Sequence, residues 1–518
     1  RVVTVTFHPD RGVLLSAEID RRMVLRAGGA LAVAAGLNVV PGVAFAAGSP
    51  AGTTKTQKAA GVFPPGNPDY FYLPVDVPRG VNRIDVSYTY DRPTVPAGVR
   101  GNACDIGMFG PEGIDAGNTK AFRGWSGGFR TSFTISASDA TPGYIPGPIK
   151  PGRWHVILGP YTVAPQGLTY SVSVTLTYGP AGAAFQPHPA PLSAPARQRG
   201  RSWYRGDSHL HTVYSDGRRT PDELVAAARA AGLDFITSTD HNTQSSQLQW
   251  GDHATDDLLI LNGEEVTTRS GHWPAIGLPA GTWLDWRYRS SEPDAFARFV
   301  EEAHQHGGLV TAAHPFANCF GCAYEYTYDA VDLVEVWNGP WTLDDEATVT
   351  AWQSMLRSGT FIPAIGDSDA HNPDQVVGLP QTVVLADSLE RGALMRGLKA
   401  GRSWIAESAQ VGLTFAATAA GRTAGIGNTL KVATGTPVVI RVDVTGAPDA
   451  TIQVLDQTGP VFAGAVDASG AGTLTWTAYR RYSTFVRIEV RRPAVAGMPG
   501  AMVAMTNPLF LTGASSGS

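Results

Sequence analysis

The chain has 518 residues, of which 43% are hydrophobic and 16% charged, and its formal net charge is −5 at pH 7. This length exceeds what one hydrophobic core supports, so we expect two to four domains. The acidic balance argues against general nucleic-acid binding and against an anionic membrane surface, because such partners select a basic face. After the first 46 residues, no segment is apolar and long enough to cross a bilayer.

The first residues have the organisation of an export signal. A basic stretch begins at Arg21-Arg22, an apolar run covers residues 27–40, and Ala44-Phe45-Ala46 offers a small-x-small cleavage site. The paired arginines resemble a twin-arginine signal, and the apolar run is too short for a membrane anchor. We therefore expect residues 1–46 to be a signal peptide and the mature protein to be exported to the extracellular space, the periplasm or the cell envelope.

Residues 61–182 are predicted to form a β-sandwich. Between residues 168 and 178, Leu, Tyr and Val side chains alternate with Thr and Ser, which is the period of a half-buried strand. Residues 84–90 repeat this pattern, and turns rich in Gly and Pro separate the two runs. The following residues, 183–201, contain four prolines and no periodicity, so we expect a stiff, solvated linker.

Residues 202–405 change to an alternation of apolar runs with helical patterns. One helix is predicted after Thr220, which caps it together with Glu223, and Gly232 ends it. Alternation of strand and helix over this length indicates a parallel α/β layer or barrel. Short alternating runs return over residues 406–513, which predicts a second β-sandwich.

The three cysteines are too few for a disulfide scaffold. Cys319 and Cys322 form one C-x-x-C pair and leave Cys104 single. A second such pair is missing from the sequence, so a zinc ribbon is disfavoured, and we expect a small structural disulfide.

Ligand-type side chains close nearly every predicted strand of residues 202–405. Six of the 12 histidines belong to this group, and carboxylates accompany them. Since the carboxyl ends of parallel strands meet at one face, these side chains are expected to converge there. Buried together they would be unpaired without a cation, which predicts a metal centre. The expected ligands are His209, His211, Asp216, His241, Glu265, His272, His314, Asp369 and His371.

Imidazoles and carboxylates together suit zinc, manganese or iron better than magnesium or calcium. The number of ligands exceeds what one ion uses, so two or three divalent ions are expected. A carboxylate that bridges two ions is the usual device of such clusters, and Glu265 can take this role, with its neighbour Glu264 as the alternative. His304 and His306 end a helical pattern instead and are expected to be structural.

Five motifs in chain order resemble the polymerase-and-histidinol-phosphatase (PHP) superfamily. They are H-x-H-T-x-x-S-D-G from residue 209, then T-D-H, G-x-E, A-H-P and G-D-S-D-A-H. The residues within these motifs are most similar to those of the CehA/McbA branch. The resemblance covers residues 203 to about 405. It implies a distorted (β/α)7 barrel, flanked here by the two sandwiches, with a trinuclear centre. The implied ligand sets are His209, His211, Glu265 and Asp369 for the first ion, Glu265, His272 and His314 for the second, and Asp216, His241 and His371 for the third.

The resemblance implies a metal-dependent hydrolase in which a metal-bound hydroxide is the nucleophile. We expect an exported phosphoesterase that prefers phosphodiesters to monoesters, acts on a small molecule and uses Glu265, Asp369 and His371 as catalytic residues. Candidate substrate-binding residues near the motifs are Arg218, Arg219, Asn242 and Asn338.

Two alternatives stay open. Carbaryl hydrolases in the same branch favour carbamate, ester or amide hydrolysis, for which Trp273, Trp283, Trp286 and Trp337 would line an apolar pocket or else form core. A non-catalytic module that binds a polymer or the cell wall is the alternative of another class, and it predicts gaps in the ligand set.

Overall fold

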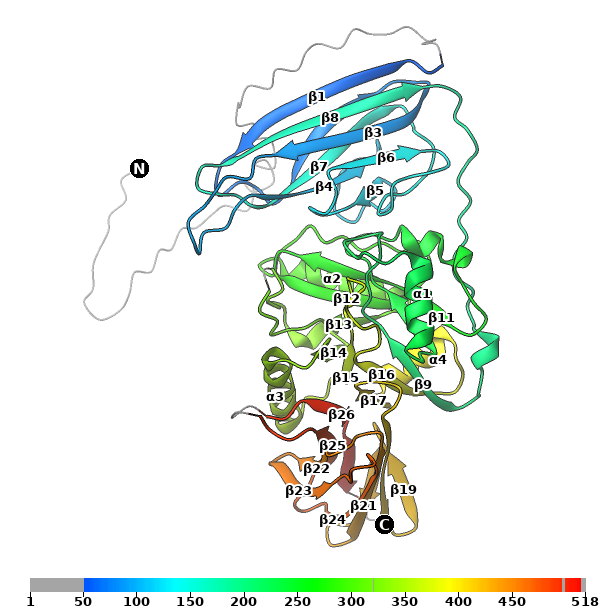
Figure 1. Ribbon diagram of the computed structural model, residues 1–518, viewed down its shortest axis with the longest axis vertical. Helices are drawn as coiled ribbons and strands as arrows, with labels where there is room; N and C mark the ends of the chain where they lie inside the picture. Colours follow the sequence, from blue (N-terminus) through cyan, green and yellow to red (C-terminus); the bar gives the residue numbers. More distant parts are fainter. Residues whose placement is uncertain (1–50, 320, 496–498, 514–518) are drawn as a thin grey trace, which may run out of the picture.

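The computed structural model describes residues 51–319, 321–495 and 499–513. Figure 1 shows a β-sandwich at one end, a mixed α/β region in the middle and a second β-rich region at the other end. The expected signal peptide, residues 1–46, lies outside the described residues. Among the described residues, no helix has both the length and the apolar composition needed to span a membrane.

The N-terminal region consists of two four-stranded antiparallel sheets, in the orders β1-β8-β3-β6 and β2-β7-β4-β5. Alternate side chains of its last strand are buried, as the sequence period predicts. The inward faces of both sheets share one apolar core. The strands are β1 (Thr54–Phe63), β2 (Phe71–Val77), β3 (Val81–Tyr90), β4 (Ala103–Phe109), β5 (Phe122–Trp125), β6 (Ser132–Ser136), β7 (Gly152–Thr162) and β8 (Leu168–Tyr178).

The proline-rich connection, residues 183–201, is exposed over most of its length but forms backbone hydrogen bonds with the central domain. The His188 amide donates to the Leu248 carbonyl at 2.7 Å, and Ala194 is fully buried. A short 3-10 helix, η2 (Pro195–Arg197), follows. The expected solvated linker is therefore anchored to the central domain, because its backbone amides find acceptors there.

The central domain contains nine strands and four α-helices. Three short 3-10 helices, η3 (Ser246–Leu248), η4 (Trp250–Asp252) and η5 (Tyr328–Ala330), lie in its connections. The remaining elements are β9 (Ser202–Asp207), α1 (Pro221–Ala230), β10 (Phe235–Ser238), β11 (Leu259–Thr268), β12 (Gly271–Leu278), α2 (Pro293–Gln305), β13 (Leu309–Ala312), β14 (Leu333–Asn338), α3 (Leu343–Ser358), β15 (Ala364–Asp367), β16 (Gln381–Ala386), α4 (Arg391–Lys399) and β17 (Ser403–Ala406).

The central sheet is mixed, so strand and helix alternate in only part of it. Strands β9, β10 and β11 are parallel to one another, and so are β13, β14 and β15. Strand β12 runs antiparallel to both of its neighbours, since the connection from β11 is too short to contain a crossover helix. The described part thus keeps the expected α/β character without the regular alternation of a (β/α)7 barrel.

Helix α1 shows how local sequence sets these elements. Thr220 caps it by accepting from the Glu223 amide, and Glu223 returns a carboxylate to the Thr220 amide, which is a complete capping box. The helix ends before Gly232, which has a φ of 73°. Its buried side chains face the sheet, and the two segments that it connects are the metal-ligand loop after β9 and strand β10.

The C-terminal region is also a β-sandwich, but it is continuous with the central sheet. One of its sheets has the order β19-β18-β21-β24, and the other joins the central domain through antiparallel pairing of β17 with β26. A single sheet of 15 strands results. The strands are β18 (Gly412–Ala419), β19 (Arg422–Gly425), β20 (Thr429–Val432), β21 (Pro437–Thr445), β22 (Thr451–Asp456), β23 (Gly459–Ala465), β24 (Gly472–Tyr479), β25 (Phe485–Arg491), β26 (Met502–Thr506) and β27 (Leu509–Gly513).

Candidate metal centre

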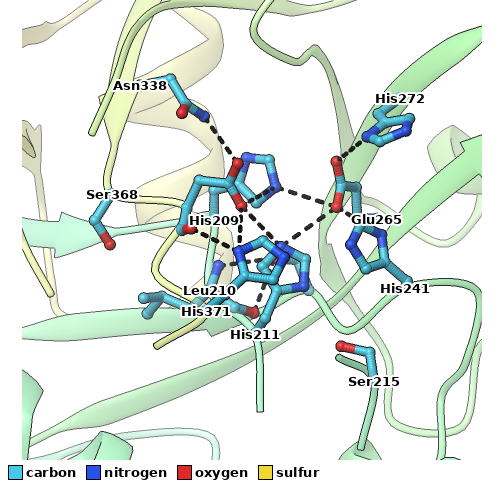
Figure 2. Close-up of polar contacts among 12 residues, drawn as sticks. His209, Leu210, His211, Ser215, His241, Glu265, His272, Asn338, Ser368 and His371 are labelled. Carbon is cyan, nitrogen blue, oxygen red and sulfur yellow. Dashed lines mark hydrogen bonds and ion pairs between the residues drawn. The ribbon is translucent and has the colours of Figure 1, made fainter. Parts of the chain in front are cut away.

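All nine expected ligands converge at one edge of the central sheet. His209 and His211 follow β9, His241 follows β10, His314 follows β13, and Asp369 and His371 follow β15, while Glu265 and His272 lie within β11 and β12. Asp216 comes from the loop before α1. Figure 2 shows the Glu265 carboxylate among the imidazoles of His209, His211, His241 and His272.

Glu265 lies at the middle of the cluster. Its Oε2 atom is 3.3 Å from Nε2 of both His209 and His211 and 2.8 Å from Nδ1 of His241. Its Oε1 atom is 3.0 Å from Nδ1 of His272. The two oxygens of one carboxylate therefore face different groups of imidazoles, which is the geometry that a bridging ligand requires.

Glu264 faces away from this cluster. Neighbouring residues of a strand point to opposite sides of the sheet, so only one of the two glutamates reaches the centre. The Glu264 Oε2 atom accepts a hydrogen bond from the Leu284 amide at 2.9 Å. Burial raises the pKa of Glu264 well above its usual range, which favours the neutral acid at this position in the core.

Asp369 completes the group around the first two histidines. Its Oδ1 atom is 3.3 Å from Nε2 of His209 and 3.0 Å from Nε2 of His211. The Asn338 amide nitrogen lies 3.3 Å from Oδ2 of Asp369 and 3.0 Å from Oε2 of Glu335. The Asn338 side chain thus donates to a carboxylate of the cluster, while its contact with substrate stays a prediction (Figure 2).

Two further groups lie beside this one. Ligand atoms of His211, Asp216, His241 and His371 lie within 4.8 Å of one another. On the other side, His314 places Nε2 at 3.5 Å from Oε1 of Glu265, next to His272. The structure therefore gathers the nine side chains in overlapping groups, in which His211 lies with Asp216, His241 and His371 and His314 lies with His209 and Asp369 as well as with His272. The assignment of each ligand to one of three ions stays a prediction.

The Sγ atom of Cys322 also lies within 4.8 Å of the ligand atoms of His272 and His314. Cys322 is bonded to Cys319, with Cα atoms 5.4 Å apart, and Cys104 is buried and free. The sequence indicated the disulfide but not its place beside the metal ligands.

Several ligand atoms of the cluster are buried without a hydrogen-bond partner among the described residues. They are Nε2 of His209, both ring nitrogens of His211, Nδ1 of His314, Oε2 of Glu265, and Oδ1 of Asp216 and Asp369. Buried polar atoms normally have partners, and this many unsatisfied lone pairs directed at one place fit divalent cations. The residues therefore suit the expected metal ions.

Charges within the cluster shift its pKa values in opposite directions. Burial lowers the pKa of His209, but the carboxylates of Asp369, Glu335 and Glu265 outweigh this effect and raise it well above the usual range. Burial raises the pKa of Glu265, and the imidazoles of His241, His209 and His272 bring it well below. These directions favour a protonated His209 beside an ionised Glu265, so a cation bound here would compete with protons.

Three residues at the centre have backbone conformations that side chains other than glycine rarely adopt. The φ angles are 55° for Asn242, 26° for His314 and 49° for Asp369. Such strain persists only where surrounding contacts enforce it, and it is concentrated at functional sites. It supports this edge of the sheet as the functional region of the domain.

Glu335 is a site residue that the sequence analysis did not identify. Its Oε1 atom is 2.9 Å from Nδ1 of His209, and its Oε2 atom accepts from the His314 amide at 2.8 Å. Accepting from Nδ1 orients the His209 ring so that Nε2 faces the centre. The signal available in the sequence was its position on a strand, three residues before Asn338.

The other three expected substrate-binding residues form hydrogen bonds with the backbone of other segments. Arg219 donates from Nη2 to the carbonyl oxygens of Pro373 and Gln375, at 3.0 and 2.6 Å, which anchors one loop to another. Asn242 exchanges two hydrogen bonds with the Thr267 backbone. Arg218 is exposed, and its amide donates to the His371 carbonyl at 2.7 Å. Substrate contact by these three residues stays a prediction.

His304, expected to be structural, lies outside the cluster. Its Nε2 atom is 2.7 Å from Asp332 Oδ2, at the end of α2. The four tryptophans proposed as pocket or core are all fully buried. Of these, Trp286 also lines a cavity beside the ligands, where it lies with Trp125 at a ring-centroid distance of 4.6 Å.

Comparison with known proteins gives distant matches. No family model matches the chain. An uncharacterized protein of Methanocaldococcus jannaschii is 24% identical over 153 residues, which cover 26% of this chain and 81% of that protein.

Solved structures are similarly distant. A two-domain protein of Bacteroides vulgatus, described as containing a PHP-like metal-dependent phosphoesterase, aligns with a TM-score of 0.34 and 16% identity over 63% of this chain and all of that one. A protein of Bifidobacterium adolescentis described as a metal-dependent phosphoesterase aligns with a TM-score of 0.25 and 19% identity, covering 37% and 94% of the two chains. An amidohydrolase of Chromobacterium violaceum aligns with a TM-score of 0.26 and 19% identity, covering 33% of this chain and 89% of that one. Likeness at this level assigns no activity to the chain.

Proposed function

We propose that this protein is a metal-dependent hydrolase that cleaves phosphate esters, with diesters preferred to monoesters. The observation that carries this proposal is the convergence of nine ligand side chains, six of which have buried nitrogen or oxygen atoms without a hydrogen-bond partner among the described residues. Their number and their overlapping groups support two or three divalent ions, and the mixture of imidazole and carboxylate favours zinc, manganese or iron.

Bound divalent ions would supply a water of lowered pKa as the nucleophile and positive charge for the phosphoryl oxygens. The protein's own contribution is to hold the ligands in place. Glu265 faces two groups of imidazoles at once, Asn338 holds Asp369, and Glu335 fixes the tautomer of His209. Asp369 and His371 belong to neighbouring groups, so a substrate at the centre would contact both.

Phosphate esters are chosen because the five ordered motifs resemble a superfamily that mostly cleaves such bonds. The leaving group of a diester must depart with its negative charge, so aryl diesters are expected to react much faster than alkyl diesters. The test combines metal analysis of the purified protein with a hydrolysis screen of bis(p-nitrophenyl) phosphate, p-nitrophenyl phosphate and a naphthyl carbamate. A metal-containing protein that cleaves neither phosphate ester would contradict the proposal.

A carbamate or carboxylic ester hydrolase is the second candidate, and one observation favours it. The cavity beside the metal ligands is lined by aromatic side chains, including Trp125, Phe129 and Trp286. An apolar wall suits an uncharged aryl substrate. Faster turnover of the naphthyl carbamate than of either phosphate would establish this alternative.

A non-catalytic module that binds a polymer would have lost ligands, whereas all nine side chains are present and gathered here. Metal-free protein that binds a polysaccharide and hydrolyses nothing would restore this possibility. The partner proposed here is a small-molecule ester rather than a nucleic acid, because a net charge of −5 does not favour general binding to a polyanion.

Export is proposed on the sequence of residues 1–46 alone. Cleavage after Ala46 would leave a mature protein that begins at Ala47. Mass spectrometry of secreted protein should find this start, and secreted protein that retains residues 1–46 would contradict the proposal.

A further inference from the structure

The cavity beside the metal centre is formed by two domains. Its volume is about 390 Å³, and its lining includes His241 and His272 of the metal centre on one side. The other side consists of residues of the N-terminal sandwich, among them Tyr70, Asp105 and Phe129. A substrate bound at the ligands would therefore extend against a domain that the sequence analysis treated as separate.

The contact between these two domains is extensive and specific. The Phe122 ring stacks on Trp283 with centroids 4.2 Å apart. Thr243 Oγ1 donates to the Gly143 carbonyl at 3.0 Å, and Arg289 pairs with Asp69 at 2.6 Å. Apolar stacking combined with such hydrogen bonds holds the cavity wall in a fixed position relative to the ligands.

Arg269 is the cationic side chain of this cavity. It follows β11 directly, four residues after Glu265, which is about 13 Å along an extended strand. Its side chain is only 7% exposed, and neither terminal nitrogen has a hydrogen-bond partner among the described residues. A guanidinium group stays charged in proteins, so these buried donors represent unused capacity to bind an anion.

Aromatic rings and one carboxylate surround this guanidinium group. Its central carbon lies 3.9 Å from the Tyr161 ring centroid and 5.6 Å from that of Tyr70. The nearest carboxylate oxygen, Oδ2 of Asp105, is 3.7 Å from Nη2, which is too far for a hydrogen bond. The aromatic faces fix the plane of the group, and its planar donors match a carboxylate or phosphate.

We propose that this cavity is the leaving-group subsite of the enzyme and that Arg269 binds an anionic group carried by an aromatic leaving group of the substrate. This inference rests on the proposed hydrolase function. The metal ligands would take the scissile ester, the rings of Tyr70, Trp125 and Phe129 would contact the aromatic part, and Arg269 would receive a terminal carboxylate or phosphate. The N-terminal sandwich is then part of the active site.

Binding tests this subsite without requiring turnover. Calorimetric titration of the full-length protein with 4-methylbenzoate and its neutral isostere 4-methylbenzamide should show a preference for the anion. Arg269→Gln should weaken the binding of the benzoate at least ~10-fold, as expected for charge-assisted hydrogen bonds, and leave the benzamide unchanged. Arg289→Gln is the matched control, because it removes an arginine of the same domain contact that does not line the cavity.

The titrations are repeated after the metal ions have been removed with a chelator. The difference in benzoate affinity between the native protein and Arg269→Gln should persist, because it does not depend on the ions. Replacing the benzoate with phenylphosphonate shows whether a carboxylate or a phosphate is the better ligand. Equal benzoate affinity of the native protein and Arg269→Gln would overturn the subsite. If the native protein binds benzoate through Arg269 but hydrolyses none of the screened esters, the result would count against the proposed function and not against the anion-binding role of Arg269.

Discussion

The two β-sandwiches flank the same central sheet, but buried charges at the two contacts differ in character. At the C-terminal contact, Glu489 accepts from Arg487 at 2.6 Å and from Arg491 at 2.5 Å, and Arg491 also pairs with Glu346 of α3 at 2.7 Å. At the N-terminal contact, Arg269 and Asp105 lie near each other without a hydrogen bond.

Under the proposed Arg269 subsite, this difference separates a structural contact from a functional one. A buried ion network whose donors and acceptors are all used holds two parts together and has little capacity left for a ligand. Unused donors beside a cavity cost free energy in the folded protein unless a ligand satisfies them. We therefore expect substitutions on the C-terminal side of the central sheet to change stability alone, and substitutions on the N-terminal side to change binding and activity as well as stability.

The largest effect is expected at the metal centre, on the N-terminal side. Glu265→Ala should release more than one metal ion and abolish activity, because this carboxylate faces two groups of imidazoles. Loss of a ligand should exceed the about 100-fold penalty of losing a partner outside the coordination sphere. Elemental analysis and hydrolysis assays measure both effects. His304→Ala is the control and should retain metal and activity, whereas unchanged metal content in Glu265→Ala would refute the centre.

On the C-terminal side, Glu489→Ala should lower stability without altering the chemistry. It leaves two buried arginines without their shared carboxylate, a loss of about 3–5 kcal/mol in the free energy of unfolding. Chemical denaturation would measure the loss, and kcat/KM of the folded protein at 25 °C should equal that of the native protein. A fall in kcat/KM at full folding would break the division between the two sides.

The same residue predicts a loss of stability in acid. Burial raises the pKa of Glu489, but Arg487 and Arg491 overcome this and lower it below its usual range. A lowered carboxyl pKa contributes stability above the unfolded value of about 4.3, and this contribution is lost as pH falls further. Native protein should therefore lose more stability than Glu489→Ala as pH falls through this window.

Asp105 predicts the opposite pH dependence at the N-terminal contact. Burial raises its pKa to about 6, although Arg269 opposes the shift. A raised carboxyl pKa favours the folded state at low pH, and this contribution disappears as pH rises from about 4 to about 6. Asp105→Asn should therefore stabilise the protein by about 2–3 kcal/mol at pH 7.5 and have little effect near pH 4. Thermal unfolding across this range measures the difference, and a pH-independent effect would contradict the assignment.

The smallest effect is expected from Glu335→Gln. The amide still accepts a hydrogen bond from His209 but lacks the charge that favours ligand orientation and basicity. Metal affinity should fall about 10–100-fold, while the ion count at saturating metal should stay the same. Competition with a chromogenic chelator would measure the affinity, and an unchanged value would show that Glu335 serves only the fold.

Local patterns predicted elements whose formation depends on near neighbours. The capping box of Thr220 and Glu223 and the alternation through β8 both occur as expected, because hydrogen bonds along the chain and side-chain period act over a few residues. The convergence of the candidate ligands could also be predicted, since parallel strands bring their ends together. Glu335 was missed because a glutamate on an apolar strand has no local feature that distinguishes it from a core acid.

By itself, the sequence determined which residue types could bind metal and that β-rich segments flank an α/β segment, because composition and period carry that information. Only the tertiary structure decided how those segments meet. The continuation of β17 into β26 and the approach of Asp105 to Arg269 depend on contacts between residues more than 90 positions apart. Such contacts form when whole faces of sheets pack against each other. A short stretch of sequence does not specify which distant segment will pack against it.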